Sequence, residues 1–571
     1  MFKLGFCSSG SGAVVNETVR KMILTKLVKA GHQVTPDALE YIGNSEDPLL
    51  MADQVIRMAT DARVAVITRE TLDSLKTPSL GSDTLQLDQP YAPASDENQD
   101  HGEQADISRN QQAHTGNVVV LDSPTDQSVG SGGELVDFWS LFADRFRRIR
   151  RMYKNRVDTA NAMVPATVAK RYKSSAAHMR RSRTEGGRGQ AVPPQVVLGM
   201  VKEKNVSHSR NVIVELEGFE ERDDSDDSGS RLGPSIEQYG TITCIIPSGR
   251  TGQAGLVLGE KGNALLPDEV VCISGRIDED RRLIADDIIY PDVPTSRKVG
   301  RAGRDVYAAF ISDLHYGSRE FLEDDFESFI AWMNGRNVEE EKKSMVRQIG
   351  YLLIAGDLCD GVGVYPDQKE HLAVSSIYEQ YSYLAEKLKK LPQSVTTLCI
   401  PGNHDACRQA LPRPPIPSEF AHALYSMRDR VLMLGDPTNV LIEGVHVLMT
   451  HGDALDDLVT QMPGVSYEKP EMGMKELLRK RHLAPTYGGK TELAPLSRDW
   501  LVIDHVPDII HFGHAHHNAV DNYRGVQIIN SGTFQAQTEF MRKQGVKPTP
   551  GIVTLINLRT GAPEVELFHA F

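Results

Sequence analysis

The sequence of 571 residues has no run of 18 or more apolar residues, so no membrane-spanning helix is expected. The N-terminal residues also lack an apolar stretch long enough for a secretory signal, and we therefore expect a cytoplasmic protein. An excess of basic residues is missing as well, since 63 Lys and Arg stand against 77 Asp and Glu, a net charge of −14. This balance excludes a protein that coats nucleic acid with a uniformly basic surface, while a local basic face stays open.

Cysteines and aromatic residues are also scarce. The six cysteines form no CxxC pair, and several lie inside apolar, strand-like runs. We therefore expect buried free thiols in place of disulfides or a cysteine-ligated zinc site. Hydrophobic residues make up 40% of the chain, which is enough to bury real cores. A chain of this length is too long for one core, and we expect two to four domains.

Residues 1–76 are expected to form a small helical domain. Thr35, Pro36 and Asp37 form a typical helix start, with a capping hydroxyl, a proline whose missing N–H costs nothing there, and a carboxylate in the first turn. Two interpretations stay open for this unit. It is either a docking module or a helical cap with no chemistry of its own.

The charge of the chain changes sign after this unit. Residues 77–133 hold nine acidic residues and one basic residue, and we expect a disordered acidic linker. Residues 134–190 are expected to form a basic helical segment, with fourteen Lys or Arg between Arg145 and Arg188. This segment either contacts phosphates or an acidic partner, or is a solvated helix face that balances the linker.

Five β-like runs follow within about a hundred residues. They cover residues 196–201, 211–216, 241–246, 269–277 and 283–290. Five short strands with glycine-rich turns predict a small barrel, and we assign residues 191–298 to an OB-fold domain. OB-folds often bind single strands through aromatic platforms, but this segment has few aromatic residues, so a scaffold role is the better prediction.

Residues 299–571 alternate apolar strands with helical stretches, and polar motifs directly follow five of the strands. The motifs contain Asp313 and His315, Asp357 and Asp360, Asn403, His404 and Asp405, His451 and Asp453, and His514 and His516. Loops at strand ends are held by a rigid sheet, as a precise metal site requires. A single pair of this kind is weak, but five in one order are a specific signal.

The motif set D-x-H, G-D-x-x-D, G-N-H-D, H and G-H-x-H resembles the calcineurin-like metallophosphoesterase superfamily. The resemblance implies an α/β phosphoesterase, a β-sandwich flanked by helices, preceded here by the OB-fold barrel and the small N-terminal helical domain. It also implies two metal sites bridged by Asp357. One site takes Asp313, His315 and His516, and the other takes Asn403, His451 and His514.

Four further motif residues have supporting roles by the same resemblance. His404 would face the substrate and stabilise or protonate the leaving oxygen. Asp405 would orient His404, or would only satisfy a backbone N–H of the turn. Asp360 and Asp453 are expected to hold the ligands from outside the site.

The ligand types indicate which cofactors to expect. Two divalent cations against two aspartate ligands leave a net positive charge, which suits the anion of a phosphate diester. Imidazole-rich ligands favour Mn, Fe or Zn over Mg, which prefers oxygen and water. We therefore predict two divalent ions, Mn first, with Fe, Zn or Mg as alternatives.

Residues 356–368, 401–414 and 488–518, and the order of the domains, resemble the small subunit of archaeal D-family DNA polymerase. The resemblance covers residues 135–571 well and is thin over residues 1–75. It implies a 3′–5′ proofreading exonuclease beside a separate large catalytic subunit, acting on single-stranded or frayed 3′ DNA in the nucleoid. A link to a sliding clamp through the complex stays open.

An exonuclease must hold a single strand, and residues 474–493 offer basic side chains near the last motif. We predict that Arg479, Lys480, Arg481 and Lys490 contact DNA phosphates, the alternative being a solvated helix. Other functions also stay open: an assembly subunit with a vestigial nuclease, an independent repair nuclease, or a phosphatase. The complete ligand set argues against the first of these.

Overall fold

We describe the protein from a computed structural model, in which the chain divides into two units, Met1–Gly102 and Glu103–Phe571. The described residues of the first unit are 23–24, 26–27, 33–43, 51–52, 55–56 and 66–67. Those of the second unit are 117–171, 194–221, 236–247 and 253–569. Most of the predicted linker (77–116), the basic residues 172–190 and Cys7 therefore lie outside the described residues.

The described residues of the first unit form a short helix and one pair of strands. α2 (Pro36–Gly43) begins at the predicted proline. β1 (Gln33–Val34) pairs in parallel with β2 (Val66–Ile67), which the sequence pattern does not predict. A small core is made by Ile23, Leu27, Ala38, Leu39, Ile42, Ala52, Val55 and Ile67. The helical domain over residues 1–76 as a whole stays a prediction.

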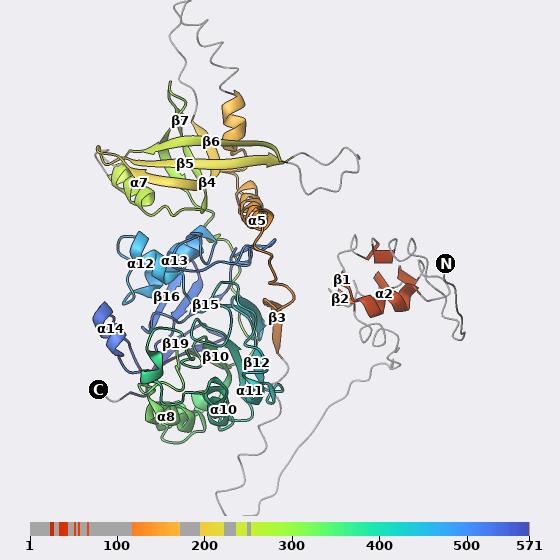
Figure 1. Ribbon diagram of the computed structural model, residues 1–571, viewed down its shortest axis with the longest axis vertical. Helices are drawn as coiled ribbons and strands as arrows, with labels where there is room; N and C mark the ends of the chain where they lie inside the picture. The colour runs from red at the N-terminus through yellow and green to blue at the C-terminus, as the bar shows by residue number, and fades with distance from the viewer. Residues whose placement is uncertain are drawn as a thin grey trace, which may run out of the picture. The chain divides into compact units, whose positions relative to one another are not determined.

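Five strands of the second unit close into a barrel in the order β4-β5-β6-β8-β7, with β7 paired back to β4 (Figure 1). They are β4 (Gln195–Val206), β5 (Val212–Glu221), β6 (Ile236–Ile246), β7 (Val270–Ile277) and β8 (Leu283–Ile289). Each strand overlaps one of the five predicted runs, so these strands are confirmed. α7 (Gln253–Asn263) packs Leu258 against the barrel core. The assignment to the OB-fold stays a prediction.

Two six-stranded sheets make up most of the remaining chain. In order across the first sheet, the strands are β12 (Val431–Met433), β11 (Thr396–Ile400), β10 (Ile349–Ala355), β9 (Tyr307–Ile311), β18 (Ile552–Asn557) and β19 (Pro563–Leu567). Across the second they are β16 (Ala519–Tyr523), β17 (Val526–Asn530), β15 (Ile509–Phe512), β14 (Val445–Met449), β13 (Thr438–Ile442) and β3 (Val118–Asp122). β9 to β12 run parallel to one another, as do β14, β15 and β17.

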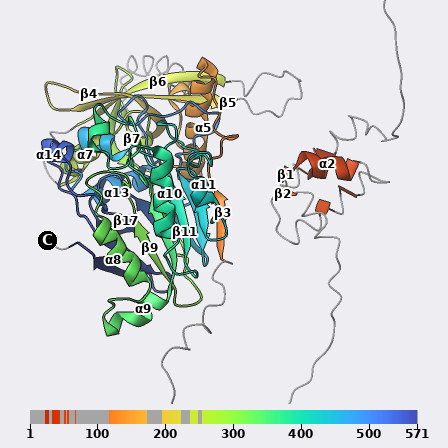
Figure 2. The ribbon, with the colours of Figure 1, turned by 60° about the horizontal axis from the view of Figure 1, so that its bottom comes forward.

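The sheets stack face to face and are covered by helices, as expected for a β-sandwich flanked by helices. Because side chains alternate along a strand, β10 sends Leu353 into the core between the sheets and Leu352 into the core under the helices. α8 (Glu323–Met333), α10 (Ile377–Leu388) and α11 (His422–Tyr425) cover the first sheet (Figure 2). α12 (Leu455–Gln461) and α13 (Pro470–Lys480) cover the second. The short helices α9 (Lys343–Arg347) and α14 (Glu539–Gln544) complete the set, with 3-10 turns at Glu340–Lys342 and Gln368–His371.

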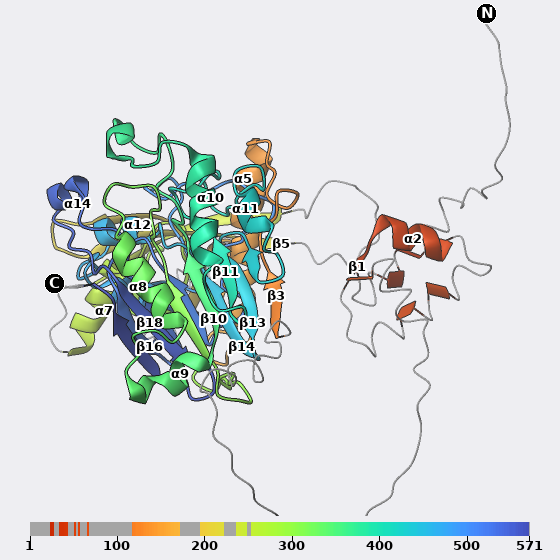
Figure 3. The ribbon, with the colours of Figure 1, turned by 90° about the horizontal axis from the view of Figure 1, so that it is seen from below.

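One strand of the second sheet comes from the stretch predicted to be a disordered linker. β3 pairs antiparallel with β13 at the edge of the sheet, with Val118 opposite Ile442 (Figure 3). Just beyond β3, the hydroxyl of Ser123 accepts a hydrogen bond from the N–H of Gly435, 312 residues further along the chain. The linker prediction is therefore wrong for residues 117–133. The acidic composition of the stretch concealed one short apolar run with a distant partner.

The basic helix α5 (Leu135–Lys154) packs between the barrel and the sandwich, and two of its arginines are buried there. Arg145 Nε lies 2.7 Å from Asp499 Oδ2, and Arg148 forms an ion pair with Asp504. These two arginines join parts of the same chain, so neither a phosphate contact nor a solvated face describes them.

Five of the six cysteines lie among the described residues, and all five are free thiols. Four of them are buried and Cys407 is half-buried, as the sequence predicts. Within the described ranges, no helix combines the length and the apolar character needed to cross a bilayer.

Candidate metal centre

The predicted ligands all follow strands that end at one edge of the sandwich. Asp313 and His315 follow β9, Asp357 follows β10, Asn403 follows β11, His451 follows β14, and His514 and His516 follow β15. β9, β10 and β11 are parallel neighbours in one sheet, and β14 and β15 are parallel neighbours in the other. The carboxyl ends of parallel strands share one edge, where ligand sites of open α/β sheets form. Loops from both sheets therefore meet there.

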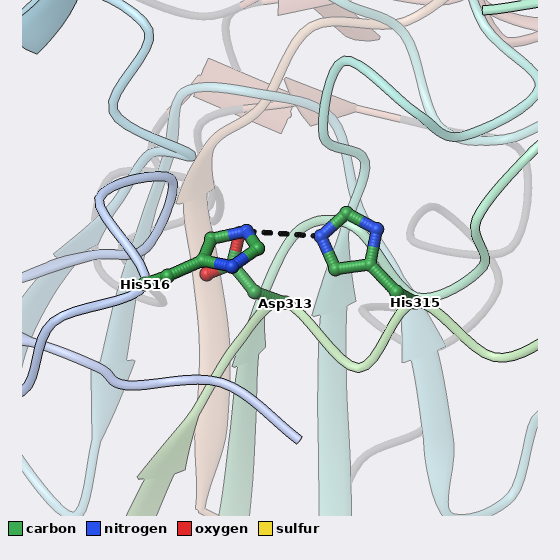
Figure 4. Close-up of side chains that lie close together, drawn as sticks. All are labelled: Asp313, His315 and His516. Atoms are coloured by element: carbon green, nitrogen blue, oxygen red, sulfur yellow. Dashed lines mark hydrogen bonds and ion pairs between the residues drawn. The ribbon is translucent and has the colours of Figure 1, made fainter. Parts of the chain in front are cut away.

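The first group of ligand atoms belongs to Asp313, His315 and His516 (Figure 4). His315 Nε2 lies 3.0 Å from His516 Nε2, and His516 Nε2 lies 3.3 Å from Asp313 Oδ1. All three side chains are buried, and one ligand atom from each lies within 4.8 Å of the other two. The structure thus brings together the three residues predicted for one metal.

The second group belongs to Asn403, His451 and His514. His451 Nε2 lies 2.9 Å from Asn403 Oδ1, and His514 Nδ1 lies 3.2 Å from the same oxygen. The two imidazole nitrogens are 3.3 Å apart. The three residues predicted for the other metal therefore converge on the amide oxygen of Asn403.

Asp357 lies between the two groups. Its Oδ2 is 3.5 Å from His315 Nε2 and 3.5 Å from His451 Nε2. Its Oδ1 accepts a hydrogen bond from the N–H of His404 at 2.8 Å, which fixes the carboxylate. One buried carboxylate thus contacts both groups, as a shared ligand must.

Five of the seven predicted ligand residues have a left-handed backbone. The φ angles are 51° at Asp313, 50° at His315, 50° at Asp357, 65° at His514 and 53° at His516. Asp and His tolerate this region better than most residues, yet strain of this kind still costs about 1–3 kcal/mol per residue. Five such residues in one place indicate a site where the positions of the side chains matter more than an unstrained backbone.

Gly402 allows the loops to approach this closely. A Cβ atom at position 402 would lie 2.1 Å from Asp357 Oδ1 and 2.4 Å from the Asp357 backbone nitrogen. Any side chain there would push Asp357 away from its place between the two groups. The glycine of the G-N-H-D motif is therefore required by the position of the shared ligand.

Three imidazoles are fixed by hydrogen bonds on the side away from the centre. His315 Nδ1 lies 3.1 Å from Asp360 Oδ1, His451 Nδ1 lies 2.8 Å from the carbonyl oxygen of Ala355, and His514 Nε2 lies 3.0 Å from Asp456 Oδ1. Each contact leaves the opposite ring nitrogen facing the other ligands. Such outer partners set the orientation and basicity of metal ligands.

The two aspartates predicted to hold the ligands from outside the site differ in what they contact. Asp360 contacts His315 as expected, and also accepts a hydrogen bond from Gln368 at 3.0 Å. Asp453 instead accepts two hydrogen bonds from Arg413, one of them 2.9 Å long. The residue that holds a ligand in its place is Asp456, which the sequence reasoning missed. Its only local signal is its position in the first turn of α12, three residues after Asp453.

The buried charges of the centre depend on one another. Burial alone would lower the pKa of His315, but its hydrogen bond to Asp360 and the charge of Asp357 raise that pKa to about 9. Burial would raise the pKa of Asp357, but the charges of His451 and His404 hold it well below its usual value. The buried carboxylates of the centre therefore stay ionised only while positive charge lies beside them.

Divalent cations fit this set of donors. The approach of two imidazole nitrogens to 3.0 Å, at His315 and His516, leaves room for a single proton, whereas a cation uses both lone pairs. His516 Nδ1 is also buried with no hydrogen-bond partner among the described residues, so its ring is placed by something other than an outer bond. Imidazole, carboxylate and amide ligands together suit Mn, Fe or Zn.

His404 and Asp405 behave differently from each other. The His404 ring lies edge-on to His315 at 4.6 Å, with Nδ1 2.9 Å from the carbonyl oxygen of Asp360. Burial lowers the pKa of His404. Asp405 accepts hydrogen bonds from the N–H groups of Leu358, Cys359 and Gly402 and from the Tyr381 hydroxyl. It fixes the turn and does not contact the imidazole, so the prediction of a catalytic Asp405 is wrong and its alternative, a structural role in the turn, is supported.

The predicted DNA contacts are contradicted for two of four residues. Lys480 is 1% exposed and pairs with Glu269, and Arg481 is 4% exposed and donates to the carbonyl oxygen of Ile503. Both side chains bind neighbouring segments of the same chain, because a buried charge is costly without a partner. Arg479 is half-buried, with its guanidinium over the Tyr523 ring and an ion pair to Glu476. Lys490 is exposed and stays a predicted DNA contact.

Solved structures and a family model each match part of this chain. A solved structure described as a novel archaeal phosphodiesterase matches 46% of this chain and 99% of its own, with 12% identity and a TM-score of 0.24. A model of the family of B subunits of DNA polymerases alpha and epsilon matches residues 308–520.

Two archaeal relatives match more of the sequence. The DNA polymerase II small subunit of Archaeoglobus fulgidus is 43% identical over 316 residues, which span 55% of this chain and 62% of that protein, less than two thirds of its length. The DNA polymerase II small subunit of Halobacterium salinarum is 32% identical over 549 residues, which span 94% of this chain and 97% of that protein. Because the second match covers nearly all of both proteins, the chain belongs to the family of small subunits of archaeal D-family DNA polymerase.

Proposed function

We propose that this protein is the 3′–5′ exonuclease subunit of an archaeal D-family DNA polymerase. The observation that carries the proposal is Asp357, which lies 3.5 Å from an imidazole nitrogen of each ligand group. A carboxylate shared in this way suits a pair of metal ions, and such pairs serve the hydrolysis of phosphodiesters. The clustering of five left-handed residues at the proposed ligands supports the same function, because strained backbone gathers at functional sites.

In the proposed reaction, the oxygen of water bonds to phosphorus and the bond from phosphorus to the 3′ oxygen breaks. The products are a 5′-mononucleotide and a shorter strand with a 3′ hydroxyl. Two divalent cations, Mn as we propose, would supply a water of lowered pKa and positive charge at the phosphate. They would be held by Asp313, His315 and His516, by Asn403, His451 and His514, and by the shared Asp357.

The residues around this centre orient the ligands and hold a proton. His404 Nδ1 donates to the carbonyl oxygen of Asp360 at 2.9 Å, so Nε2 is the nitrogen left to exchange a proton with the leaving 3′ oxygen. Asp360 and Asp456 keep His315 and His514 turned toward the centre. The centre is therefore preorganised on sheet ends, as catalysis by positioning requires.

The partners belong to the proposal as well. The relatives are named small subunits of a DNA polymerase, which supports a large catalytic subunit as partner and a frayed 3′ end as substrate. Contact with a sliding clamp would then come through the complex.

The test uses the purified full chain, a single strand labelled at its 5′ end, and MnCl2. We expect the wild type to shorten the strand stepwise from its 3′ end. Asp357→Asn should lower the rate by at least about a hundredfold, because loss of a shared ligand should cost more than loss of an outer partner. Asp286→Asn, at a partly exposed position on β8, is the matched control and should keep the wild-type rate.

Two results would replace this function with another. A wild type that degrades DNA no faster than Asp357→Asn would indicate an assembly subunit with a vestigial site. Full nuclease activity in a chain that never co-purifies with a large polymerase subunit would indicate an independent repair nuclease.

A further inference from the structure

The loop that follows Asp360 carries an aromatic ring beside His404. The ring centroids of Tyr365 and His404 are 6.2 Å apart, with the rings inclined by 60°. The Tyr365 hydroxyl lies 3.1 Å from His371 Nδ1. Of the Phe, Tyr and Trp rings in the described part of the chain, that of Tyr365 is the one in ring contact with an imidazole of the centre.

Two buried glutamines fix the shape of this loop. Gln368 donates to the carbonyl oxygen of Asp360 at 2.7 Å and accepts from the N–H of Val364 at 2.8 Å. Gln380 of α10 accepts from the N–H of Gly361 and donates to its carbonyl oxygen, both at 3.0 Å. The loop is thus held against the outer partner of the metal centre, and Tyr365 is placed with it.

The ring remains reachable from solvent. Tyr365 is half-buried, and its loop neighbours Val362, Gly363 and Pro366 are exposed. The hydroxyl is engaged by His371, so the apolar ring is the part left for a ligand. An aromatic surface therefore lies at the rim of the centre, beside the imidazole that we assign to the leaving oxygen.

We propose that Tyr365 is a positioning residue that stacks on the nucleobase of the 3′-terminal nucleotide. This inference rests on the proposed function, since it requires a DNA end at the centre. Aromatic rings stack on every base, so Tyr365 would select for the presence of a base and not for its identity. A base can reach the ring only when it has left the duplex, which costs least at a mismatch. The ring would thus favour frayed ends.

The kinetic test compares two single strands that differ only at the 3′ end, one with a normal nucleotide and one with an abasic residue. We expect the full-length wild type to have a KM about tenfold lower for the normal end. Tyr365→Leu should raise that KM to the abasic value, with kcat and the abasic-ended strand unaffected. Tyr365→Phe should keep the preference, and Tyr383→Leu, at an exposed tyrosine of α10, should match the wild type.

A binding measurement does not depend on hydrolysis. With the metals chelated, wild type and Tyr365→Phe should quench the fluorescence of a 3′-terminal 2-aminopurine more strongly than Tyr365→Leu does. Equal quenching by wild type and Tyr365→Leu would overturn the inference, as would an equal slowing of both strands by Tyr365→Leu. If the wild type quenches the fluorescence through Tyr365 but hydrolyses neither strand, the proposed function is refuted while stacking of Tyr365 on the terminal base is supported.

Discussion

The metal centre and the joint between α5, the barrel and the sandwich are both clusters of buried ionisable groups, but their charges are balanced in different ways. At the joint, opposite charges meet in pairs, such as Arg145 with Asp499 at 2.7 Å and Lys480 with Glu269 at 2.5 Å. At the centre, two imidazole nitrogens meet at 3.0 Å and one carboxylate lies between two rings.

This difference separates a structural cluster from a functional one. In a buried ion pair, each charge has its counter-charge within the protein, so removing one partner leaves the other uncompensated. Ligand atoms that face one another have lone pairs to share, and they are satisfied only by a proton or a cation. Burial and charge alone would not distinguish the two clusters, whereas the kind of atom facing each group does.

The largest effect is expected from breaking the joint. Arg145→Met should lower the free energy of unfolding by about 3–5 kcal/mol, because it removes the cation beside buried Asp499. Chemical denaturation measures the change. Arg145→Met combined with Asp499→Leu should recover part of the loss, and Mn affinity of the folded variant should stay at the wild-type value. If Arg145→Met alone lowers the free energy of unfolding by less than about 1 kcal/mol, the buried ion pair does not stabilise the fold as we expect.

A somewhat smaller effect is expected from acid at the same joint. His482 Nε2 donates to Asp499 at 2.9 Å while Nδ1 accepts from the N–H of Ala484, so the ring is neutral. Burial and the charge of Arg145 lower the pKa of His482 to about 4. Above pH 6.5 the ring is neutral in both states. As the pH falls from 6.5 to 4, only the unfolded chain takes up the proton, and stability falls by about 2–3 kcal/mol.

The measurement for this prediction is the free energy of unfolding across that pH range. His482→Gln removes the titrating group and should flatten the slope between pH 6.5 and 4. Equal slopes for wild type and His482→Gln would contradict the assignment.

A third prediction concerns the outer bonds of the metal centre. Asp456→Asn should weaken Mn binding by about 10- to 100-fold, because His514 loses the carboxylate that orients it. Isothermal titration with MnCl2 measures the affinity. Asp453→Asn should instead lower stability more than affinity, because that carboxylate belongs to Arg413. The reverse pattern would exchange the roles assigned to these two aspartates.

The smallest effect is expected from an exposed charge. Lys490→Gln should reduce the slope of log K against log salt by about 0.7 for single-stranded DNA, the value of one phosphate contact. Lys480→Gln should lower stability, because the buried amine faces Glu269. An unchanged slope in Lys490→Gln would remove Lys490 from the predicted DNA contacts and leave Arg479 as the one of the four that still stands.

The convergence of the candidate ligands could be predicted because each lies in a short local pattern. An apolar strand followed at once by Asp313 or His451 is visible without knowledge of the fold, and parallel strands bring such ends together. The five barrel strands were visible for the same reason. Six of the seven predicted ligands accordingly meet in the two groups described above, and Asp357 lies between the groups.

The features that sequence reasoning missed depend on partners far along the chain. β3 is a strand only because it pairs with β13, where Val118 lies opposite Ile442. In the sequence, Lys480 and Arg481 look like solvent-facing cations. Only the folded structure shows that Lys480 forms an ion pair with Glu269 and that Arg481 donates to the carbonyl oxygen of Ile503. Asp456 has no motif, since an acidic first turn is an ordinary feature of helices.

The left-handed ligand residues also bear on how such a site decays. A lineage that no longer needed the nuclease would gain stability by replacing Asp313 or His516 with glycine or asparagine, which relax the backbone at φ values near 50°. Valine or isoleucine would bring no such relief. Sequences that have lost the centre should therefore show a recognisable pattern. Glycine or asparagine should replace the imidazoles and carboxylates, while the surrounding strands are retained.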